Sequence, residues 1–433
     1  MITILSFLFV LGVLVFVHEL GHFLVARWHG VRVITFSLGF GPKILKFQRG
    51  DTEYCISVIP LGGYVKLAGE TMEEVQGGAP DEFMSKSKWV RFQVYLAGPV
   101  MNILLAIVVS AAVLSRGASV PLYIKAVPVI GSVAAGSPAE VAGLRVGDRV
   151  VDIDGESVST WDAVELAVLT KAGRELSIGA LRDGQTVHIR VTPAASGRFE
   201  TGEIGIGPVM RPEITQVNPH SPAEEGGLRA GDVLVAVDGA RGVSHHDTIE
   251  RIHNSANKPL VLTVERAGAP VDVTVVPRGA EGAALIGVVI SEYEVQHIDP
   301  TAMQAIKMSL AQNWEHTVMI GKTIRGLITR DTPVQQLMGP VGMAQLSGSA
   351  AEIGWTALFG LMAMISLNLG LLNLMPVPVL DGGHIAILAV EAIARRDLSA
   401  RVKERVLMTG VSLVVLLMVT VIYNDIARLV RLR

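Results

Sequence analysis

The stretch VFVHELGHFL, residues 15–24, places three polar side chains inside a long apolar segment. His18, Glu19 and His22 stand among Val, Phe and Leu, and the apolar segment reaches back to the first residues of the chain. An ionisable group in the hydrocarbon of a membrane costs roughly 2.5–3.5 kcal/mol, so such groups are rare and usually functional. The stretch therefore predicts a membrane helix that carries a functional site.

The spacing of these side chains indicates the kind of site. Residues four positions apart project from the same face of a helix, so His18 and His22 can bind one ion. Glu19 lies beside them, where it can accept a proton from a water molecule that the metal activates. A short HExxH pattern also arises by chance in surface helices, but its place in a membrane segment favours a metal site. Catalytic zinc usually has three protein ligands, so a third must come from elsewhere.

The composition indicates a membrane protein. Of the 433 residues, 50% are hydrophobic and 18% are charged, and the mean hydropathy is +0.46. A net charge of −3 gives no basic field for nucleic acid, and the single cysteine, Cys55, excludes an internal disulfide framework and a cysteine-based zinc site. The first apolar segment is too long for the core of a cleavable signal peptide and lacks a basic start, so we interpret it as a signal anchor. We expect four transmembrane helices, at residues 1–26, 92–115, 353–385 and 405–425.

Basic residues predict the orientation of these spans. Residues 27–91, which we expect to form a membrane-entering β-region, and the loop after the third span are both rich in Lys and Arg. Such loops stay in the cytoplasm, although the basic tail that ends at Arg433 argues mildly for the opposite orientation. We therefore expect both chain ends and the long segment between the second and third spans on the outer side. The histidine site then lies toward the cytoplasmic side.

The long outer segment contains a repeat. GSPAEVAGLRVGDRVVDIDG, residues 136–155, recurs as HSPAEEGGLRAGDVLVAVDG, residues 220–239, each followed by a helical stretch and alternating strand patterns. The sequence of both copies resembles PDZ domains of the bacterial protease type, so we expect two tandem PDZ domains at residues 118–200 and 202–292. PDZ domains bind a peptide or a free C-terminus as an added strand, but both copies could also be rigid spacers. We assign GEIGIGPV, residues 202–209, to the loop and edge strand of the second copy.

Residues 300–350 predict amphipathic helices. Met, Ile, Leu and Trp lie on one side of residues 301–330, and four charged residues interrupt the apolar run, namely Lys307, Glu315, Lys322 and Arg325. We expect this segment at the membrane interface or packed on the bundle, and not as a fifth span.

The third span supplies the candidate third ligand. It ends in NLMPVPVLDGGH, residues 373–384, and enters the membrane from the same side as the first span. At about 1.5 Å per residue, Asp381 reaches the level of the two histidines. Pro376 and Pro378 break the helix there, and broken backbone at this depth must be buried in protein or line a wet cavity. Asp381 is the preferred ligand and His384 the second choice, although an Asp-Gly turn at a membrane boundary needs no metal.

HELGH in the first span and NLMPVPVLDG in the third resemble the site-2 protease family of intramembrane zinc metalloproteases. The resemblance extends over nearly the whole chain, since four spans and a tandem PDZ insert are also typical of bacterial members. It implies a multi-pass α-helical membrane protein with a membrane-associated β-hairpin region. It also implies Zn²⁺ as the cofactor, with ligands at His18, His22 and Asp381 and with Glu19 as the general base.

Further stretches match motifs of the same family. SLGFGPKI, residues 37–44, matches a membrane-entering loop, and SLNLGLLNLMP, residues 366–376, matches a segment whose asparagines contact substrate. The substrate contacts that these matches imply are Gly39, Gly41, Asn368 and Asn373.

Each of these matches also has a simpler interpretation. The two glycines could form an ordinary hairpin turn, although the stretch 33–47 could instead present a strand edge that holds an unwound substrate. Asn373 could donate a hydrogen bond to the developing oxyanion or only cap the broken helix. AGPVMN, residues 97–102, matches a motif of the second span, and for its Gly98, Pro99 and Asn102 we favour helix packing.

The resemblance implies the substrates and the compartment. The expected substrates are single-pass membrane proteins that another protease has already shortened on the outer side, such as an anti-sigma factor in an envelope-stress response, and remnant signal peptides are a second class. The expected location is the bacterial inner membrane, in contact with lipid, with the PDZ domains in the periplasm. Two other classes of protein remain as alternatives: a membrane-anchored PDZ adaptor with a vestigial site, and an ion-coupled transporter, since transporters also use broken helices.

Overall fold

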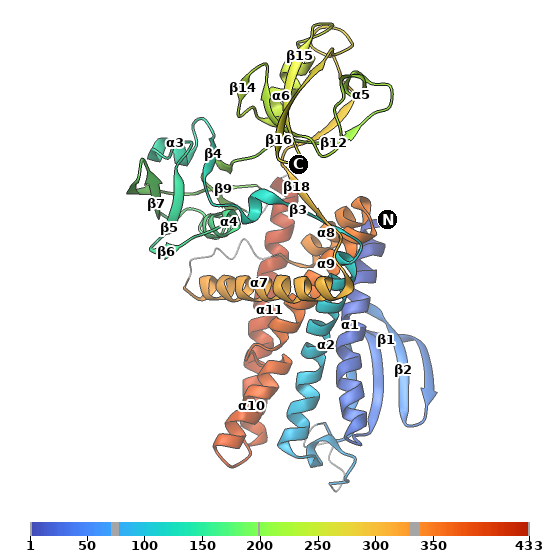
Figure 1. The fold of residues 1–433 in the computed structure, drawn as a ribbon. Coiled ribbons are helices and arrows are strands. Elements are labelled where there is room, and N and C mark those ends of the chain that lie inside the picture. Colours follow the sequence, from blue (N-terminus) through green and yellow to red (C-terminus); the bar gives the residue numbers. More distant parts are fainter. Residues whose placement is uncertain (1, 71–77, 198–199, 330–337, 432–433) are drawn as a thin grey trace. The chain divides into compact units, whose positions relative to one another are not determined.

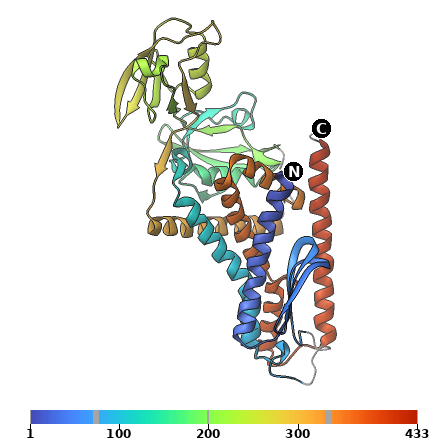
Figure 2. The ribbon, with the colours of Figure 1, turned by 90° about the vertical axis from the view of Figure 1, so that its right-hand side faces the viewer.

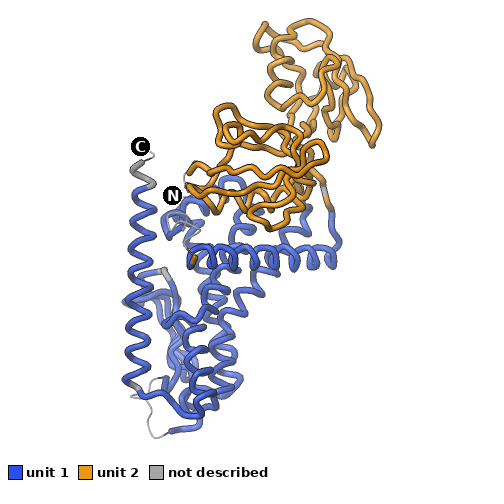
Figure 3. The backbone as a smooth tube through the Cα atoms, turned by 90° about the vertical axis from the view of Figure 1, so that its left-hand side faces the viewer, with its two compact units in different colours: residues 1–117, 299–328, 334–433 blue, residues 118–298, 329–333 orange. Residues whose placement is uncertain are grey.

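The computed structural model describes residues 2–70, 78–197, 200–329 and 338–431. Arg330 and Arg433, at the ends of two of the segments discussed above, lie outside the described residues. The chain divides into two compact units (Figure 3). Unit 1 comprises residues 1–117, 299–328 and 334–433, and unit 2 comprises residues 118–298 and 329–333.

Unit 1 is built on long apolar helices (Figure 1). Within the described part of the chain, four helices are long and apolar enough to cross a membrane: α1 (Ile2–Trp28), α2 (Lys88–Leu114), α9 (Trp355–Asn373) and α11 (Ala400–Arg431). A helix satisfies its backbone hydrogen bonds internally, which is what a lipid environment requires. Helices α1, α2 and α9 pack on one another, and Leu14, Leu358 and Met362 belong to one buried apolar cluster.

The third predicted span is interrupted. α9 ends at Asn373, and α10 (Asp381–Ile393) begins after an irregular segment that contains Pro376 and Pro378. Proline lacks a backbone N–H and clashes with the preceding turn of a helix. The break predicted from the prolines is therefore present, whereas α10 continues past the predicted end at residue 385.

An antiparallel hairpin follows α1 and lies along it in both views (Figures 1 and 2). Its two long strands bend, so that Thr35 pairs with both Lys66 and Glu53. The segments consequently lie side by side in the order 63–67, 33–38, 53–57 and 43–49. The strands are β1 (Val33–Arg49) and β2 (Thr52–Leu67), and the short helix η1 (Phe83–Ser85) leads on to α2.

Helices α7 (Ala302–Thr329) and α8 (Pro340–Ile353) precede the third span. One face of α7 is bonded to α2, since the hydroxyl of Ser309 donates to the carbonyl of Ile107 over 2.7 Å. Exposed apolar side chains recur every three or four residues along α7, at Met303, Ile306, Leu310, Trp314 and Val318. An exposed apolar stripe of this kind is typical of a helix at a membrane surface.

Unit 2 contains two similarly built β-units. The first β-unit (residues 130–208) has an antiparallel sheet in the order β6-β5-β7-β8 and its own buried core around Ile130, Leu176 and Ile178. Its elements are β4 (Ile130–Val133), α3 (Pro138–Ala142), β5 (Arg149–Ile153), β6 (Glu156–Ser157), α4 (Trp161–Leu169), β7 (Leu176–Arg182), β8 (Gln185–Val191), β9 (Ala194–Ser196), β10 (Thr201–Glu203) and β11 (Ile206–Pro208).

The second β-unit (residues 213–291) has a sheet in the order β16-β15-β13-β12-β17, with β14 on β13, and a separate core around Ile214, Leu260 and Leu262. Its elements are β12 (Glu213–Val217), α5 (Pro222–Gly226), β13 (Val233–Val237), β14 (Ala240–Arg241), α6 (His245–His253), β15 (Leu260–Arg266), β16 (Ala269–Val275) and β17 (Val288–Ser291). Elsewhere in unit 2, β3 (Ala118–Pro121) pairs with β18 (Val295–Ile298), and η2 (Leu122–Lys125) follows β3.

The repeated GSPAE and HSPAE stretches form the same local structure. Ser137 caps α3 by accepting from the backbone of Glu140, and Pro138 stands in the first turn, where its missing N–H is not needed. Gly143 ends the helix with φ +91°, a conformation that L-residues rarely adopt. Ser221 and Gly227 repeat the same cap and stop around α5. The sequence repeat is therefore a structural repeat.

The assignment of GEIGIGPV to the second copy is wrong. β11 pairs with β4 of the first β-unit, with Ile206 opposite Val133, and Ile204 lies in the first core. The equivalent strand of the second β-unit is β17, which pairs with β12 much later in the chain. The first β-unit thus extends to residue 208, because its edge strand comes from the end of its sequence.

Candidate metal centre

Two segments that are far apart in sequence meet in unit 1. The Nε2 atoms of His18 and His22 lie 3.2 Å apart. Oδ2 of Asp381 lies 3.2 Å from Nε2 of His18, and Oδ1 lies 3.5 Å from Nε2 of His22. Among the described residues, His18, His22 and Asp381 are the group whose donor atoms could together hold a metal ion.

Helix α1 presents both imidazoles from one face, as the spacing of four residues predicted. His22 is held from behind, because its Nδ1 lies 2.7 Å from the carbonyl oxygen of Val94 in α2. A carbonyl only accepts, so Nδ1 of His22 carries the proton and Nε2 is left free to bind a metal.

Glycines let α2 approach this face of α1. A Cβ at Gly98 would lie 2.3 Å from Nε2 of His22 and 2.8 Å from Cε1 of His18, so any side chain would clash with both imidazoles. A Cβ at Gly21 would lie 2.5 Å from the carbonyl oxygen of Ala97. The site therefore depends on two positions without side chains.

The break between α9 and α10 positions the carboxylate. Asp381 is the first residue of α10, where the helix dipole favours a negative charge. The next two residues, Gly382 and Gly383, have no room for a side chain, because a Cβ at either position would lie 2.3 Å from a carbonyl oxygen of the preceding loop. Val379 has φ +90°, a strained conformation for a β-branched residue. The LDGG sequence thus folds the loop tightly back against the start of α10.

The donor set fits zinc. Zinc is commonly bound by imidazole nitrogen and carboxylate oxygen at about 2.0–2.2 Å in tetrahedral geometry, which separates neighbouring donors by about 3.3–3.5 Å. The three separations found here are 3.2, 3.2 and 3.5 Å. Three protein donors leave one tetrahedral position for water or substrate, the arrangement of a catalytic site.

Glu19 lies next to the donor set and is 9% exposed. It packs against β2, since a Cβ at Gly63 would lie 3.0 Å from Cγ of Glu19 and 2.8 Å from a methyl of Val15. Gly63 belongs to the segment 63–67, which has a pairing partner on one side only within the described hairpin. The edge strand of the described hairpin therefore starts beside the candidate general base.

Comparison with known proteins identifies the class of this centre. The sequence pattern described as Peptidase family M50 matches residues 6–417. The chain belongs to peptidase family M50. The regulator of sigma-E protease RseP of Escherichia coli is 35% identical to it over 98% of both chains, and the protease RseP of Yersinia pestis is 34% identical over 99% of both. A Neisseria meningitidis protein named as a putative zinc metalloprotease is 33% identical over 99% of both chains.

The M50 chain is consequently a zinc-dependent peptidase, as the resemblance to site-2 proteases implied. A solved PDZ domain of an SdrC-like protein from Listeria innocua aligns with 19% of the M50 chain and 93% of its own length, at 27% identity and a TM-score of 0.17.

The other predicted site residues belong to two other elements. Gly39 and Gly41 form the bend of β1, with φ +92° and +86°, and a Cβ at Gly39 would lie 2.8 Å from the carbonyl oxygen of Ile59. Asn368 and Asn373 lie on α9, the latter as its last residue.

His384, the second choice for a ligand, is not part of the donor group found among the described residues. It lies one turn into α10 and stacks on Tyr95 of α2, with ring centroids 4.7 Å apart and planes at 8°.

Gly63 and Asn102 had no role at the centre in the sequence analysis. Gly63 gave no signal because a glycine in a strand has many explanations, although the pair Gly62-Gly63 marks a close backbone approach. Asn102 was assigned to packing, yet its side-chain amide lies 3.2 Å from Nδ1 of His18. An intramembrane asparagine four residues after Gly98 was the available signal.

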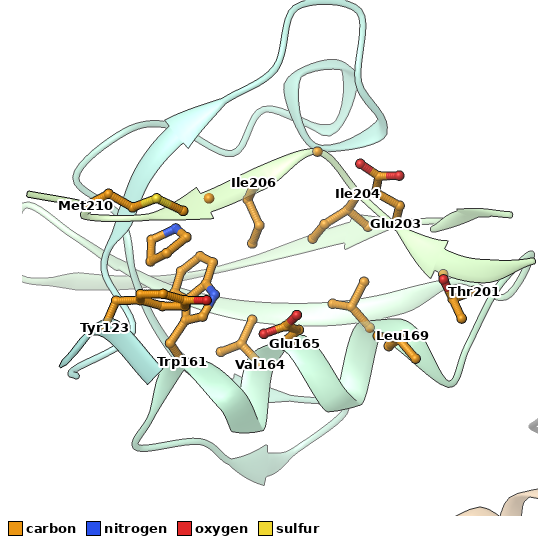
Figure 4. A pocket seen from close by; sticks show the side chains of 15 residues that line it. Tyr123, Trp161, Val164, Glu165, Leu169, Thr201, Glu203, Ile204, Ile206 and Met210 are labelled. Atoms are coloured by element: carbon orange, nitrogen blue, oxygen red, sulfur yellow. The ribbon is translucent and has the colours of Figure 1, made fainter. Parts of the chain in front are cut away.

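Each β-unit carries a groove beside its edge strand. In the first β-unit a groove of about 360 Å³ runs between α4 and residues 201–210, with Val164 and Ile206 on its walls and Tyr123 and Trp161 close together (Figure 4). In the second β-unit a groove of about 150 Å³ lies between α6 and β17. There Nε2 of His245 lies 3.2 Å from the carbonyl oxygen of Ile290 on the edge strand.

Proposed function

We propose that this M50 peptidase hydrolyses a peptide bond within the transmembrane segment of single-pass membrane proteins. The observation that carries the proposal is the donor set of His18, His22 and Asp381, which helices of membrane-spanning length bring together beside Glu19. A polar site of this kind is too costly in a membrane helix bundle without a function there. A buried peptidase site among such helices is also best placed to meet transmembrane substrates.

The chemistry follows from the positions of these residues. His18, His22 and Asp381 would hold the ion, and zinc bound there would supply polarisation of a carbonyl and a lower pKa of water. Glu19 takes the proton of the attacking water and passes it to the amide nitrogen of the leaving peptide as the C–N bond breaks. Asn373, at the end of α9, is a candidate donor to the oxygen that gains negative charge.

The hairpin would hold the substrate in an extended form. A helix shields its carbonyls in hydrogen bonds, so a transmembrane helix must unwind before it is cut. We considered the stretch 33–47 as the strand edge. Its first part, 33–38, is flanked on both sides, whereas the segment 63–67 forms the edge strand of the described hairpin beside Glu19. An unwound substrate can pair with that edge as an added strand. Gly39 and Gly41 then shape the hairpin, and Asn368 is a further candidate contact.

The β-units would act on the outer side. Both have the helix, edge strand and groove of a peptide-binding PDZ domain, so we propose that they are tandem PDZ domains that screen substrates. The basic residues of 27–91 support the orientation that we propose, with the hairpin and the metal centre toward the cytoplasm and the β-units in the periplasm of an inner membrane.

The named relatives suggest the substrate. The Escherichia coli relative is named regulator of sigma-E protease RseP, and the Yersinia pestis relative is named protease RseP. The expected substrate is therefore an anti-sigma factor that a first cleavage has shortened on the outer side. Remnant signal peptides are a second substrate class of the same chemistry.

The test is cleavage of two tagged reporters by the purified peptidase in detergent. One reporter is a single-pass protein without its outer domain, and the other keeps a folded outer domain. We expect a cut only in the shortened reporter, at a bond that mass spectrometry places inside the transmembrane segment. Cuts only outside the membrane segment would contradict the proposal.

A further inference from the structure

The side chain of Asn102 on α2 lies next to His18, at the ring nitrogen Nδ1 that does not face Asp381. It is fully buried, and its Nδ2 lies 3.2 Å from Nδ1 of His18. Its Oδ1 is buried as well and has no hydrogen-bond partner among the described residues. A buried amide oxygen without a partner is rare and calls for an explanation.

The two histidines differ in what stands behind them. The group behind His22 is the backbone carbonyl of Val94, which accepts only and so fixes the proton on Nδ1. The group behind His18 is a side-chain amide, which offers either a donor or an acceptor to Nδ1. His18 therefore has two compatible tautomers, whereas His22 has one.

Each tautomer of His18 suits one state of the site. With the amide nitrogen toward it, Nδ1 accepts and Nε2–H can donate to Oδ2 of Asp381, 3.2 Å away. Such an imidazole cannot bind a metal through Nε2, because that nitrogen carries the proton. Rotating the amide of Asn102 by 180° turns Oδ1 toward Nδ1, which then carries the proton and leaves Nε2 free.

We propose that Asn102 is a positioning residue that sets the tautomer of His18. In the metal-bound site its Oδ1 accepts the proton of Nδ1, and in the metal-free site its Nδ2 donates to Nδ1. The inference rests on the proposed role of His18 as a ligand. Carbonyl or carboxylate partners behind ligating histidines typically contribute 10–100-fold to metal affinity.

The surroundings hold Asn102 in place independently of the metal. The backbone carbonyl of Asn102 accepts from the hydroxyl of Ser366 on α9 over 2.8 Å. A Cβ added at Gly370 would lie 3.4 Å from the Cβ of Asn102, so α9 packs closely against this residue. The side-chain amide can thus turn while the backbone stays in place. Ser366→Ala removes a hydrogen bond of the same helix contact without touching His18, so it is the matched control.

The first test measures zinc affinity by competition with a chromophoric chelator, in protein that also carries Glu19→Gln. Asn102→Leu keeps the branched shape of the side chain but offers no acceptor, and we expect its affinity to fall by about 10–100-fold. Asn102→Asp keeps an acceptor and should stay within a few-fold of the parent, as should Ser366→Ala. The inference would be overturned if Asn102→Leu bound zinc as tightly as the parent. It would also be overturned if Asn102→Leu and Asn102→Asp lost the same zinc affinity.

The second test reads the tautomer directly. The ¹⁵N chemical shifts of labelled histidine should show Nδ1 of His18 protonated in the zinc form and unprotonated in the metal-free form, while Nδ1 of His22 stays protonated in both. The same Nδ1 proton on His18 in both forms would contradict the inference. Asn102→Ala replaces Asn102→Leu if the latter does not fold. Neither readout uses peptidase activity, so these results are independent of it. A parent that binds no zinc would instead refute the proposed function.

Discussion

Gly98 shows how strongly the metal centre depends on the absence of a side chain. Any Cβ at this position would clash with both imidazoles, at 2.3 Å from Nε2 of His22 and 2.8 Å from Cε1 of His18. No real Cβ contact is that short, so one of the histidines would have to move. A packing change elsewhere in the helix bundle would lower the stability of the fold. A side chain at Gly98 would instead disrupt the positions of the metal-binding histidines.

We therefore predict that Gly98→Ala loses bound zinc and all cleavage while the protein still folds. The control is Gly12→Ala on α1, where a Cβ meets nothing within 4 Å. Zinc content by mass spectrometry, with thermal unfolding in detergent as the folding check, measures both. Normal zinc content in Gly98→Ala would show that the helices do not approach as described.

Asp148 anchors the first β-unit. Its carboxylate is 2% exposed and accepts two hydrogen bonds of 2.7 Å from Arg182, which also donates to the carbonyl of Gly143. The hydrogen bonds from Arg182 lower the pKa of the Asp148 carboxyl below its usual value. Because the pKa is lower in the folded state, the pair stabilises the unit above the unfolded pKa of about 3.9, and the contribution is lost as pH falls through the folded pKa.

We predict that Asp148→Ala destabilises the first β-unit by about 3 kcal/mol at neutral pH. Hydrogen exchange of β5 and β7 in the full-length protein should speed up accordingly, and the difference from the parent should shrink as pH falls below about 4. Asp232→Ala breaks the equivalent pair with Arg266 and should loosen the second β-unit instead. A difference that grows in acid would contradict this account.

At the scale of elements, the hairpin edge beside Glu19 determines how a substrate can bind. An added strand presents alternate residues to one face, with a period of two, whereas a bound helix presents them with a period of about 3.6. Tyr64 follows Gly63 on this edge and provides a position for cross-linking.

We predict that Tyr64→Cys cross-links to a reporter with a period of two. The background carries Cys55→Ala, which removes the only native cysteine, and single cysteines are moved along the reporter near its cut. Phe47→Cys on the opposite edge of the hairpin, a side chain that is 64% exposed, is the control and should cross-link weakly. A helical period at Tyr64 would exclude strand addition.

The elements also show what sequence could and could not predict. The polar residues of HELGH, the prolines before Asp381 and the repeated SPA stretches each have a local physical meaning, so the spans, the break and the two similar β-units could be predicted. GEIGIGPV was placed in the wrong β-unit because strand pairing is non-local, and adjacency in sequence favoured the copy that follows it. Gly63 and Asn102 could not be assigned because their roles depend on which backbone and which imidazole they face.

At the scale of the whole molecule, the proposed orientation puts the β-units and the metal centre toward opposite sides of the membrane. The proposal places the first β-unit outside and the end of α10 inside. Val141 on the first β-unit and Ile393 at the end of α10 are 83% and 84% exposed, so both positions are open to a reagent.

We predict that a membrane-impermeant maleimide labels Val141→Cys in spheroplasts and labels Ile393→Cys only after the membrane is broken. Both variants carry Cys55→Ala. The reverse pattern would place the metal centre on the opposite side and would refute the proposed order of cleavages.

The central claim is that the site of His18, His22 and Asp381 hydrolyses peptide bonds with Glu19 as the base. The most direct measurement compares cleavage of the shortened reporter by the wild type and by Glu19→Gln, with bound zinc quantified in both. The account predicts equal zinc and a loss of cleavage of at least about 100-fold in Glu19→Gln, since removal of a general base commonly costs 10²–10⁴-fold. Equal cleavage by the two proteins, or a wild type that cleaves without bound metal, would contradict it.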